Sequence, residues 1–185
     1  MKNILVKKEI PGISRRAFVR RVGAVGTFAL LPSSVIFGAG LPPSEKLNLA
    51  FIGVSGRGGA NLDGLANQNV VALCDVDSQR LEATRKKYQQ AKSYKDFRRM
   101  FDEMEKSIDG VVVSTPDHTH TVAAMAAIKR RKHVYCEKPL AHNINEVRTL
   151  MDAATKYNVI TQLGNQGHSA DSIRTFCEWI KDGAV

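Results

Sequence analysis

The sequence has few cysteines, almost no acidic residues near its start, and no long uninterrupted apolar run. Three cysteines in 185 residues, Cys74, Cys136 and Cys177, are too few and too scattered for a disulfide framework or a zinc site. Cys74 and Cys136 fall within apolar runs typical of strands, where we expect small buried core residues without chemistry. A chain of this length can hold one ordinary domain with a substantial core.

The scarcity of acids is confined to the first forty residues, where Glu9 is the only one against seven basic residues. This tail supplies +6 of the formal net charge of +9, and the remaining +3 is spread over segments that also carry acids. Because the positive charge sits in a tail, we expect no nucleic-acid partner.

The basic tail has the layout of an export signal. Residues 14–21 read SRRAFVRR, and a moderately apolar stretch follows over residues 22–40. A charged segment, a paired arginine (Arg15 and Arg16) and an apolar segment closely resemble the twin-arginine (Tat) consensus. We therefore expect residues 1–40 to be a twin-arginine signal, residues 41–46 a linker, the Tat export machinery a partner, and the periplasm the location.

A membrane span is the competing interpretation of residues 22–40. Pro32 and the serines at 33–34 interrupt a segment that is already short and weakly apolar for a span. Small residues at 38–40 predict cleavage between residues 37 and 43, and no cysteine is present there for a lipoprotein. A signal that stays uncleaved and anchors the protein in the membrane remains open.

Beyond residue 46, apolar runs typical of strands alternate with helical patterns. This alternation predicts an α/β fold, a Rossmann-type doubly wound parallel sheet, over residues 47–185. The expected strands are 47–54, 69–76, 109–115, 133–136 and 159–163. The expected helices are 60–66, 78–90 capped by Ser78, one from about residue 97 to 107, 121–129, 143–157 with a capping box of Asn143 and Glu146, and 172–181. Ligands of such sheets collect beyond the carboxyl ends of the strands.

A glycine-rich turn between the first strand and the first helix is the centre of the predicted site. Residues 47–59 read LNLAFIGVSGRGG, and the unpaired N–H groups of a helix starting inside the glycines attract an anion such as a pyrophosphate. Against the pattern G-x-G-x-x-G the middle position is a serine. The candidate cofactor contacts in this turn are Gly53, Ser55, Gly56, Arg57 and Gly58.

Asp75 strengthens the case for a dinucleotide. It lies 22 positions after Gly53, at the end of the second apolar run, where a carboxylate can accept hydrogen bonds from an adenosine ribose. A βαβ unit with an ordinary glycine turn is the alternative.

Polar residues follow three further strands. Residues 114–120, STPDHTH, permit a metal site, a helix cap at Asp117, or cofactor contacts by Thr115, Pro116 and His120. We predict no metal.

After the next strand comes CEKPL at residues 136–140. Lys138 can lose solvation beside a buried strand, which would lower an ammonium pKa towards the range of proton transfer, with Glu137 balancing its charge. Pro139 rigidifies the turn and could be cis. An ordinary surface Glu–Lys pair is the alternative.

Residues 163–169, LGNQGHS, follow the last strand. Asn165, Gln166 and His168 can hydrogen-bond the hydroxyls of a sugar or polyol, and a plain polar loop fits equally well.

Taken in order, the glycine turn, CDVD at 74–77, TPDHTH at 115–120 and EKP at 137–139 resemble the N-terminal part of the Gfo/Idh/MocA family, which includes glucose-fructose oxidoreductase and inositol dehydrogenase. The resemblance implies that Lys138 is catalytic, beside the nicotinamide and the reacting carbinol, and that Glu137 and His120 lie by the cofactor. It also implies that Asp75 binds the ribose and favours NAD over NADP, whose 2′-phosphate it would repel.

Two departures from the family accompany this resemblance. Ser55 stands where the family has its middle glycine, and the second domain, an open-faced antiparallel sheet with further substrate-binding residues, is absent from this chain. We expect a fragment of a longer protein, whose full-length relative is a homo-oligomer.

The function implied is a nicotinamide-dependent oxidoreductase that takes a hydride from a sugar or cyclitol carbinol. Because export removes the protein from any evident pool of free cofactor, we expect NAD to be tightly bound. Two alternatives remain open: a cofactor-binding module without turnover, and a redox-neutral enzyme that cleaves glycosides through transient oxidation.

Overall fold

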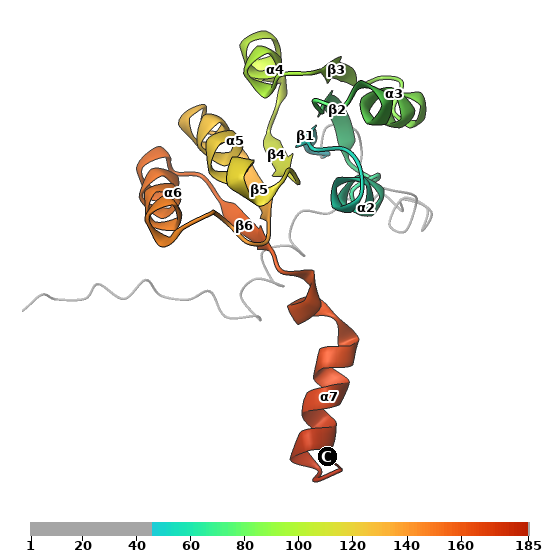
Figure 1. Ribbon diagram of the computed structural model, residues 1–185, viewed down its shortest axis with the longest axis vertical. Helices are drawn as coiled ribbons and strands as arrows, with labels where there is room; N and C mark the ends of the chain where they lie inside the picture. The colour runs from blue at the N-terminus through green and yellow to red at the C-terminus, as the bar shows by residue number, and fades with distance from the viewer. Residues whose placement is uncertain (1–45, 185) are drawn as a thin grey trace, which may run out of the picture. The chain divides into compact units, whose positions relative to one another are not determined.

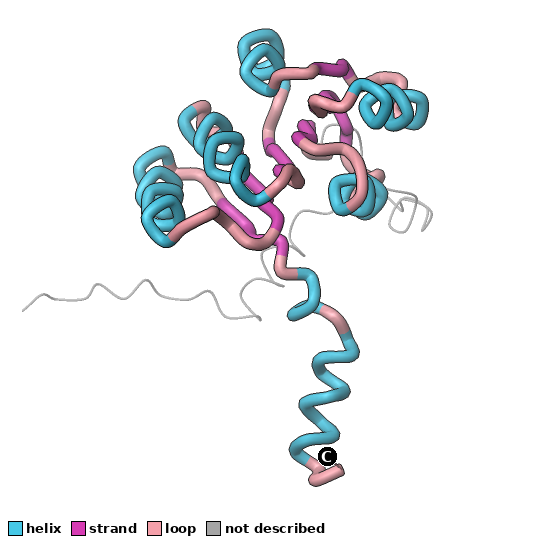
Figure 2. The backbone as a smooth tube through the Cα atoms, viewed as in Figure 1, coloured by secondary structure: helices cyan, strands magenta, loops and turns pink. Residues whose placement is uncertain are grey.

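The computed structural model describes residues 46–184, and the predicted export signal at residues 1–40 lies outside them. A six-stranded, wholly parallel sheet runs through the described part of the chain in the order β3-β2-β1-β4-β5-β6 (Figures 1 and 2). The predicted Rossmann-type fold is confirmed. The strands are β1 (Asn48–Ile52), β2 (Asn69–Cys74), β3 (Lys92–Tyr94), β4 (Gly110–Val113), β5 (His133–Glu137) and β6 (Thr161–Gly164).

Helices cover both faces of the sheet because successive strand residues point to opposite sides. In β1, Leu49 and Phe51 pack with Leu62 and Leu81 of the helices on one face, whereas Ala50 and Ile52 face the opposite cluster. Helices α2 and α3 therefore lie on one side and α4, α5 and α6 on the other (Figure 1). Their bounds are α2 (Arg57–Gly64), α3 (Ser78–Lys87), α4 (Phe97–Met104), α5 (Asp117–Lys129) and α6 (Ile144–Tyr157).

The strand β3 was not predicted from the sequence. It has three residues, and Lys92 and Ser93 are exposed, since it forms one edge of the sheet. A strand this short and polar lacks an apolar pattern, and only its pairing with β2 defines it.

Three predictions about helix starts are corrected. Asp77, and not Ser78, caps α3, because its carboxylate accepts from the N–H groups of Gln79 and Arg80. Helix α5 begins at Asp117 with Pro116 as its N-cap residue, so the predicted Asp117 cap is wrong, and the start expected at residue 121 is too late.

The Asn143 cap of α6 is confirmed, with the Glu146 N–H donating to its side chain. However, the Glu146 carboxylate accepts from the backbone N–H of His142, one residue before the expected partner in a capping box.

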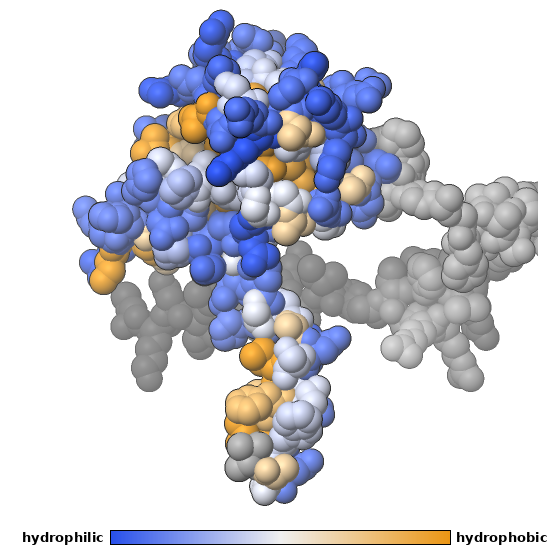
Figure 3. Space-filling model, turned by 45° about the vertical axis from the view of Figure 1, so that its right-hand side comes forward, coloured by the Kyte–Doolittle hydropathy of each residue, from blue (hydrophilic) through white to orange (hydrophobic). Residues whose placement is uncertain are grey.

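The last helix, α7 (Asp171–Lys181), follows a short 3-10 turn, η4 (Gln166–Ser169). Another 3-10 turn, η3 (Glu105–Ser107), comes directly after α4. Every side chain of α7 is exposed, including the large apolar ones of Ile173, Phe176, Trp179 and Ile180. Figure 3 shows apolar side chains gathered on one side of this helix. Within residues 46–184, no helix combines the length and the apolar character that a membrane crossing needs.

The register of the sheet brings the predicted site residues to one edge. Ile52 of β1 is paired with Cys74 of β2 and with Val113 of β4, and Val113 is paired with Cys136 of β5. The residues that follow these four are Gly53, Asp75, Ser114 and Glu137, which therefore line up at the carboxyl ends of adjacent strands.

Candidate dinucleotide-binding site

The glycine turn packs so closely that side chains are excluded from two positions. Gly53 has a φ of 85°, and a Cβ there would lie 2.5 Å from the carbonyl oxygen of Ser114. A Cβ on Gly58 would lie 2.1 Å from the carbonyl oxygen of Gly53. The turn is thereby pressed against the ends of β1 and β4, as a site that brings backbone close to a phosphate requires.

The start of α2 is open towards solvent. Gly56, its N-cap residue, has a φ of 55°, and a Cβ there would meet nothing within 4 Å. No side chain of the described residues caps this helix start. The Gly58 N–H donates to the Ser55 carbonyl oxygen at 3.0 Å. The N–H groups before and after it and the positive end of the helix dipole are therefore available to an anion.

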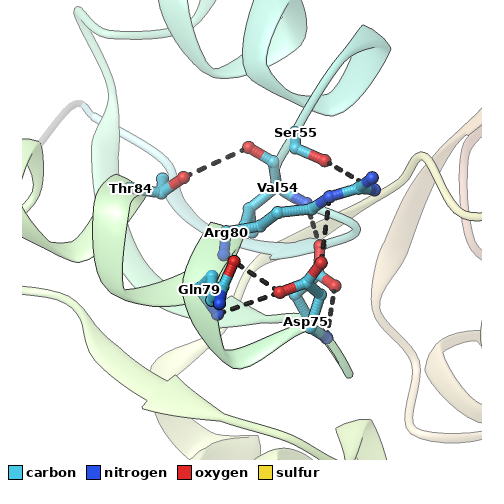
Figure 4. A network of polar contacts seen from close by, with 7 residues as sticks. Val54, Ser55, Asp75, Gln79, Arg80 and Thr84 are labelled. Atoms are coloured by element: carbon cyan, nitrogen blue, oxygen red, sulfur yellow. Dashed lines mark hydrogen bonds and ion pairs between the residues drawn. The ribbon is translucent and has the colours of Figure 1, made fainter.

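Both carboxylate oxygens of Asp75 accept hydrogen bonds that fix the side chain (Figure 4). The Val54 N–H donates to one oxygen at 3.0 Å, and the Asp77 N–H donates to the other at 3.0 Å. The first of these bonds ties the second strand to the glycine turn. Each oxygen keeps acceptor capacity, so the carboxylate can still receive ribose hydroxyls.

Ser55, the departure from the glycine pattern, contacts Arg80 of α3. The Arg80 guanidinium donates to Ser55 Oγ at 3.3 Å and pairs with the Asp77 carboxylate at 3.1 Å (Figure 4). The Arg80 side chain is 62 % exposed, so the ion pair itself adds little stability. Sequence reasoning missed Arg80, although its place in the first turn of α3, shortly after Asp75, was a usable clue.

A cavity of about 660 Å³ lies between these elements, at the carboxyl ends of β1, β2 and β4. Gly53, Ser55, Asp75, Thr115 and Pro116 line it, all of them predicted cofactor contacts. A second hollow of about 750 Å³ lies beside α3 and β3 and contains none of the predicted site residues.

Thr115 carries the one buried side-chain oxygen or nitrogen without a hydrogen-bond partner in residues 46–184. Its Oγ1 is sequestered from solvent beside the cavity. A buried hydroxyl without a partner costs free energy unless a ligand or a water supplies one. A ligand or a water in the cavity could supply the partner that this hydroxyl lacks.

His120 is buried, with 1 % of its surface exposed. Its Nδ1 lies 2.7 Å from the carbonyl oxygen of Pro139, and its Nε2 lies 2.7 Å from that of Thr115. The ring thus links the segments that follow β4 and β5, and it contacts the predicted site from the interior of the protein.

Glu137, 4 % exposed, is the buried carboxylate of the site. The side-chain amide of Asn61 donates to its Oε1 at 2.8 Å, and that of Gln166 donates to the same oxygen at 2.5 Å. A Cβ on Gly164 would lie 2.9 Å from the Glu137 carboxyl carbon, so a glycine is needed beside it. Burial raises the pKa of the neighbouring Tyr135 hydroxyl, and the Glu137 charge raises it further.

Lys138 differs from expectation. It is exposed, so the predicted loss of solvation does not occur among residues 46–184, and it makes no ion pair there with Glu137, whose carboxylate points to Asn61 and Gln166. The peptide bond between Lys138 and Pro139 is cis, the isomer that the sequence had left open. The turn therefore sends successive side chains in different directions: Glu137 into the protein and Lys138 out to solvent.

Residues 47–165 match the family model described as the oxidoreductase family with an NAD-binding Rossmann fold, GFO_IDH_MocA. The chain belongs to the Gfo/Idh/MocA family. The match covers all of the predicted cofactor contacts and ends at Asn165. Because the family model describes an NAD-binding Rossmann fold, the Gfo/Idh/MocA domain of this chain is an NAD-binding Rossmann domain.

Known relatives of this Gfo/Idh/MocA chain include dehydrogenases of cyclitols and sugars. A myo-inositol 2-dehydrogenase of Thermotoga maritima is 29 % identical over 140 residues, which cover 72 % of this chain and 41 % of the relative. A glucose-6-phosphate 3-dehydrogenase of Bacillus subtilis is 29 % identical over 119 residues, covering 61 % and 33 %.

Among solved structures, the myo-inositol 2-dehydrogenase of Lactobacillus plantarum aligns with a TM-score of 0.68 at 26 % identity, over 76 % of this chain and 42 % of that one. The chain thus spans between a third and about two fifths of the length of these relatives.

The predicted substrate residues of the Gfo/Idh/MocA domain are divided by the structure. Gln166 points to Glu137 and Tyr135, donating to the Tyr135 hydroxyl at 2.6 Å, whereas Asn165 and His168 are exposed. None of the three lines the 660 Å³ cavity. Their role towards substrate stays a prediction.

Within residues 46–184, no group of three or more histidine, cysteine or acidic side chains is arranged to hold a metal ion. The two histidines of TPDHTH illustrate the reason. His120 is buried against two carbonyl oxygens, while His118 is exposed and lines the cavity, so the ring nitrogens of this pair do not converge on one point.

Proposed function

We propose that this chain binds NAD for an oxidoreductase that oxidises a carbinol of a cyclitol or sugar. The observation that carries the proposal is the cavity at the glycine turn, which combines an open helix start, a fixed carboxylate and the orphaned hydroxyl of Thr115. The substrate class is supported by the relatives, of which two are myo-inositol 2-dehydrogenases and one acts on glucose 6-phosphate.

The residues present fit a dinucleotide in three respects. The N–H groups at the start of α2 would hold the pyrophosphate, since Gly56 leaves that approach open. Asp75, oriented by two backbone N–H groups, would accept hydrogen bonds from the adenosine ribose. The Thr115 hydroxyl would gain the partner that it lacks within the protein.

We assign the proton of the reacting hydroxyl to Lys138. Oxidation of a carbinol releases a hydride and a proton, and NAD supplies the acceptor for the hydride. An exposed lysine can take the proton when the substrate covers it and excludes water. Glu137 anchors the turn in the protein through Asn61 and Gln166, and so holds the backbone from which Lys138 projects.

We further propose export by the twin-arginine route, to the periplasm or to a membrane-anchored form, and a tightly held cofactor. The support is the sequence of residues 14–40 together with the absence of an evident pool of free dinucleotide outside the cytoplasm.

A second candidate is a module that binds NAD without turnover. One observation favours it: Lys138 is exposed, and no ion pair or side-chain hydrogen bond involves it among residues 46–184.

Calorimetric titration of the chain with NAD⁺ and with NADP⁺, followed by an absorbance assay for NADH with myo-inositol, tests both candidates. Binding with reduction supports the oxidoreductase. Binding without reduction supports the module for this chain. The absence of NAD⁺ binding would remove the dinucleotide proposal.

A further inference from the structure

Ser55 of the glycine turn and Arg80 of α3 both line the 660 Å³ cavity and contact each other there (Figure 4). Arg80 Nη1 donates to Ser55 Oγ at 3.3 Å, and Arg80 Nε pairs with the Asp77 carboxylate at 3.1 Å. A guanidinium has five N–H donors, so further donors remain after these two contacts. Because the exposed ion pair adds little stability, stability does not account for a cation placed at the cavity.

The hydroxyl of Ser55 keeps a free hydrogen. A serine hydroxyl has one donor and two acceptor lone pairs, and Ser55 Oγ uses a lone pair to accept from Arg80. Within residues 46–184 the Ser55 O–H donates to no acceptor. The backbone is fixed as well, since the Ser55 carbonyl oxygen accepts from the Gly58 N–H at 3.0 Å. The turn therefore presents an O–H donor where the pattern G-x-G-x-x-G has its middle glycine.

The charges that line the cavity explain the need for a cation beside this donor. Asp75 and Asp77 both line it, and two carboxylates repel a pyrophosphate. Arg80 offsets the charge of Asp77 through the ion pair. Lys95, in the loop between β3 and α4, also lines the cavity, but it is Arg80 that contacts the glycine turn.

We propose that Ser55 and Arg80 together form a contact for the pyrophosphate that stands in for the middle glycine, an inference that rests on the proposed function. A glycine there lets the backbone approach the pyrophosphate, whereas the serine offers a side-chain donor. Arg80 acts in two ways. It occupies a lone pair of Ser55 Oγ, which leaves the O–H to donate to a phosphate oxygen, and it places a positive charge beside the same anion.

Helix α3 is tied to the glycine turn at a second point, which holds Arg80 in position before a ligand binds. Thr84 Oγ1, one turn after Arg80, donates to the Val54 carbonyl oxygen at 3.3 Å (Figure 4). The Val54 N–H in turn donates to Asp75. Because these hydrogen bonds connect the helix, the turn and the acid, little reordering is needed when an anion binds.

Calorimetric titration with ADP-ribose tests the contact, because this probe keeps the adenosine ribose and the pyrophosphate and lacks the nicotinamide. We expect Ser55→Ala to raise the Kd about three- to tenfold and Arg80→Gln to raise it about tenfold. The double variant should lose less than the product of the two single losses, since Arg80 acts partly through Ser55. An unchanged Kd in either single variant, or a double loss equal to the product, overturns the proposal.

Two further variants separate the contact from a general effect of charge. Arg85→Gln is the matched control, because Arg85 lies on the same helix, pairs with Glu82 at 3.0 Å and does not line the 660 Å³ cavity. It should change the Kd by less than about twofold. Ser55→Thr keeps the hydroxyl and should bind within about threefold of the unmodified chain. A loss in Arg85→Gln equal to that in Arg80→Gln, or in Ser55→Thr equal to that in Ser55→Ala, refutes the assignment.

Two measurements exclude misfolding as the cause. Because the Arg80 side chain is exposed, Arg80→Gln should unfold within about 3 °C of the unmodified chain in a thermal scan. In ¹⁵N NMR of the unmodified chain, the Nε–H signal of Arg80 should shift when ADP-ribose is added, while that of Arg85 stays in place. An Arg80 signal that does not move contradicts the contact without reliance on any variant.

Titrations with NAD⁺ and NADP⁺ separate this inference from the proposed function. If NAD⁺ binds equally well to the unmodified chain, Ser55→Ala and Arg80→Gln, the inference fails and the proposed function stands. If ADP-ribose binds with the expected losses while NAD⁺ does not bind, the proposed function fails and the contact stands. If neither ligand binds, both fail. A loss in Arg80→Gln confined to NADP⁺ would assign Arg80 to the 2′-phosphate and overturn the proposal.

Discussion

The side-chain amide of Asn61, in α2, donates to the carboxylate of Glu137, at the end of β5, over 2.8 Å and 76 positions of sequence. The same amide nitrogen donates to Ser114 Oγ at 3.0 Å, at the end of β4. One asparagine of the helix that follows the glycine turn thus joins the ends of two strands and orients the only buried acid of residues 46–184. The glycine turn and the EKP turn are therefore linked through hydrogen bonds of a single side chain.

Replacing Asn61 should destabilise the protein because it leaves a buried carboxylate with fewer donors. We expect Asn61→Leu, of similar volume, to lower the free energy of unfolding by about 1–3 kcal/mol. Urea unfolding followed by circular dichroism measures it. The control is Asn67→Leu, at an exposed position just after α2, for which we expect a change within about 0.5 kcal/mol. Equal effects of the two substitutions would show that the contact with Glu137 adds nothing.

Two glycines of the same helix provide a matched test of the close packing of the turn. Gly58→Ala places a Cβ 2.1 Å from a backbone oxygen, so we expect a loss of about 1–3 kcal/mol in stability and weaker binding of NAD⁺. Gly64→Ala meets nothing within 4 Å and should be neutral or stabilising, by up to about 1 kcal/mol. Thermal unfolding and calorimetric titration of both variants check this, and a harmless Gly58→Ala would contradict the geometry of the turn.

The charge of Asp75 should set the preference between the two nicotinamide dinucleotides. Asp75→Asn keeps the volume but removes the charge and one acceptor, so we expect weaker binding of NAD⁺ and a smaller preference for NAD⁺ over NADP⁺. Loss of one charged hydrogen bond corresponds to about 1.5–3 kcal/mol in binding. Asp63→Asn, exposed on α2, is the control. An unchanged NADP⁺ to NAD⁺ ratio in Asp75→Asn would exclude Asp75 as the discriminating group.

The three thiols should differ sharply in reactivity. Burial raises the pKa of Cys74 and of Cys136 to about 12, so both remain protonated and unreactive at neutral and mildly alkaline pH. Cys177 is exposed on α7. We expect a native chain treated with a thiol reagent to show one fast equivalent, which Cys177→Ser removes, and two slow ones that appear on unfolding. A second fast thiol in Cys177→Ser would show that one of the buried sites opens readily.

Local sequence patterns were sufficient for the type and order of most elements. Unbroken apolar runs such as residues 110–113 specify strands buried on both faces. The glycines at residues 53–58 indicate a tight turn, because the close approach of backbone atoms there excludes side chains. Asp75 was singled out from its spacing after Gly53 and from its place at the end of an apolar run. Helix starts were less well predicted, because adjacent residues such as Asp77 and Ser78 both favour the cap position and only the backbone geometry chooses between them.

The connections among the strand ends were decided by the tertiary structure. Sequence placed Glu137 beside Lys138 and suggested that they pair, yet Glu137 turns inward to Asn61 and Gln166, which lie 76 and 29 positions away, and Lys138 turns out to solvent. Likewise, His120 was expected near the cofactor, but its two carbonyl contacts depend on how β4 and β5 lie side by side. By itself the sequence determined a Rossmann domain with a glycine turn after its first strand and an acid after its second, since these depend on periodicity and short spacings. Which polar groups meet one another was settled only when the parallel register brought the strand ends together, because hydrogen bonds form between neighbours in space.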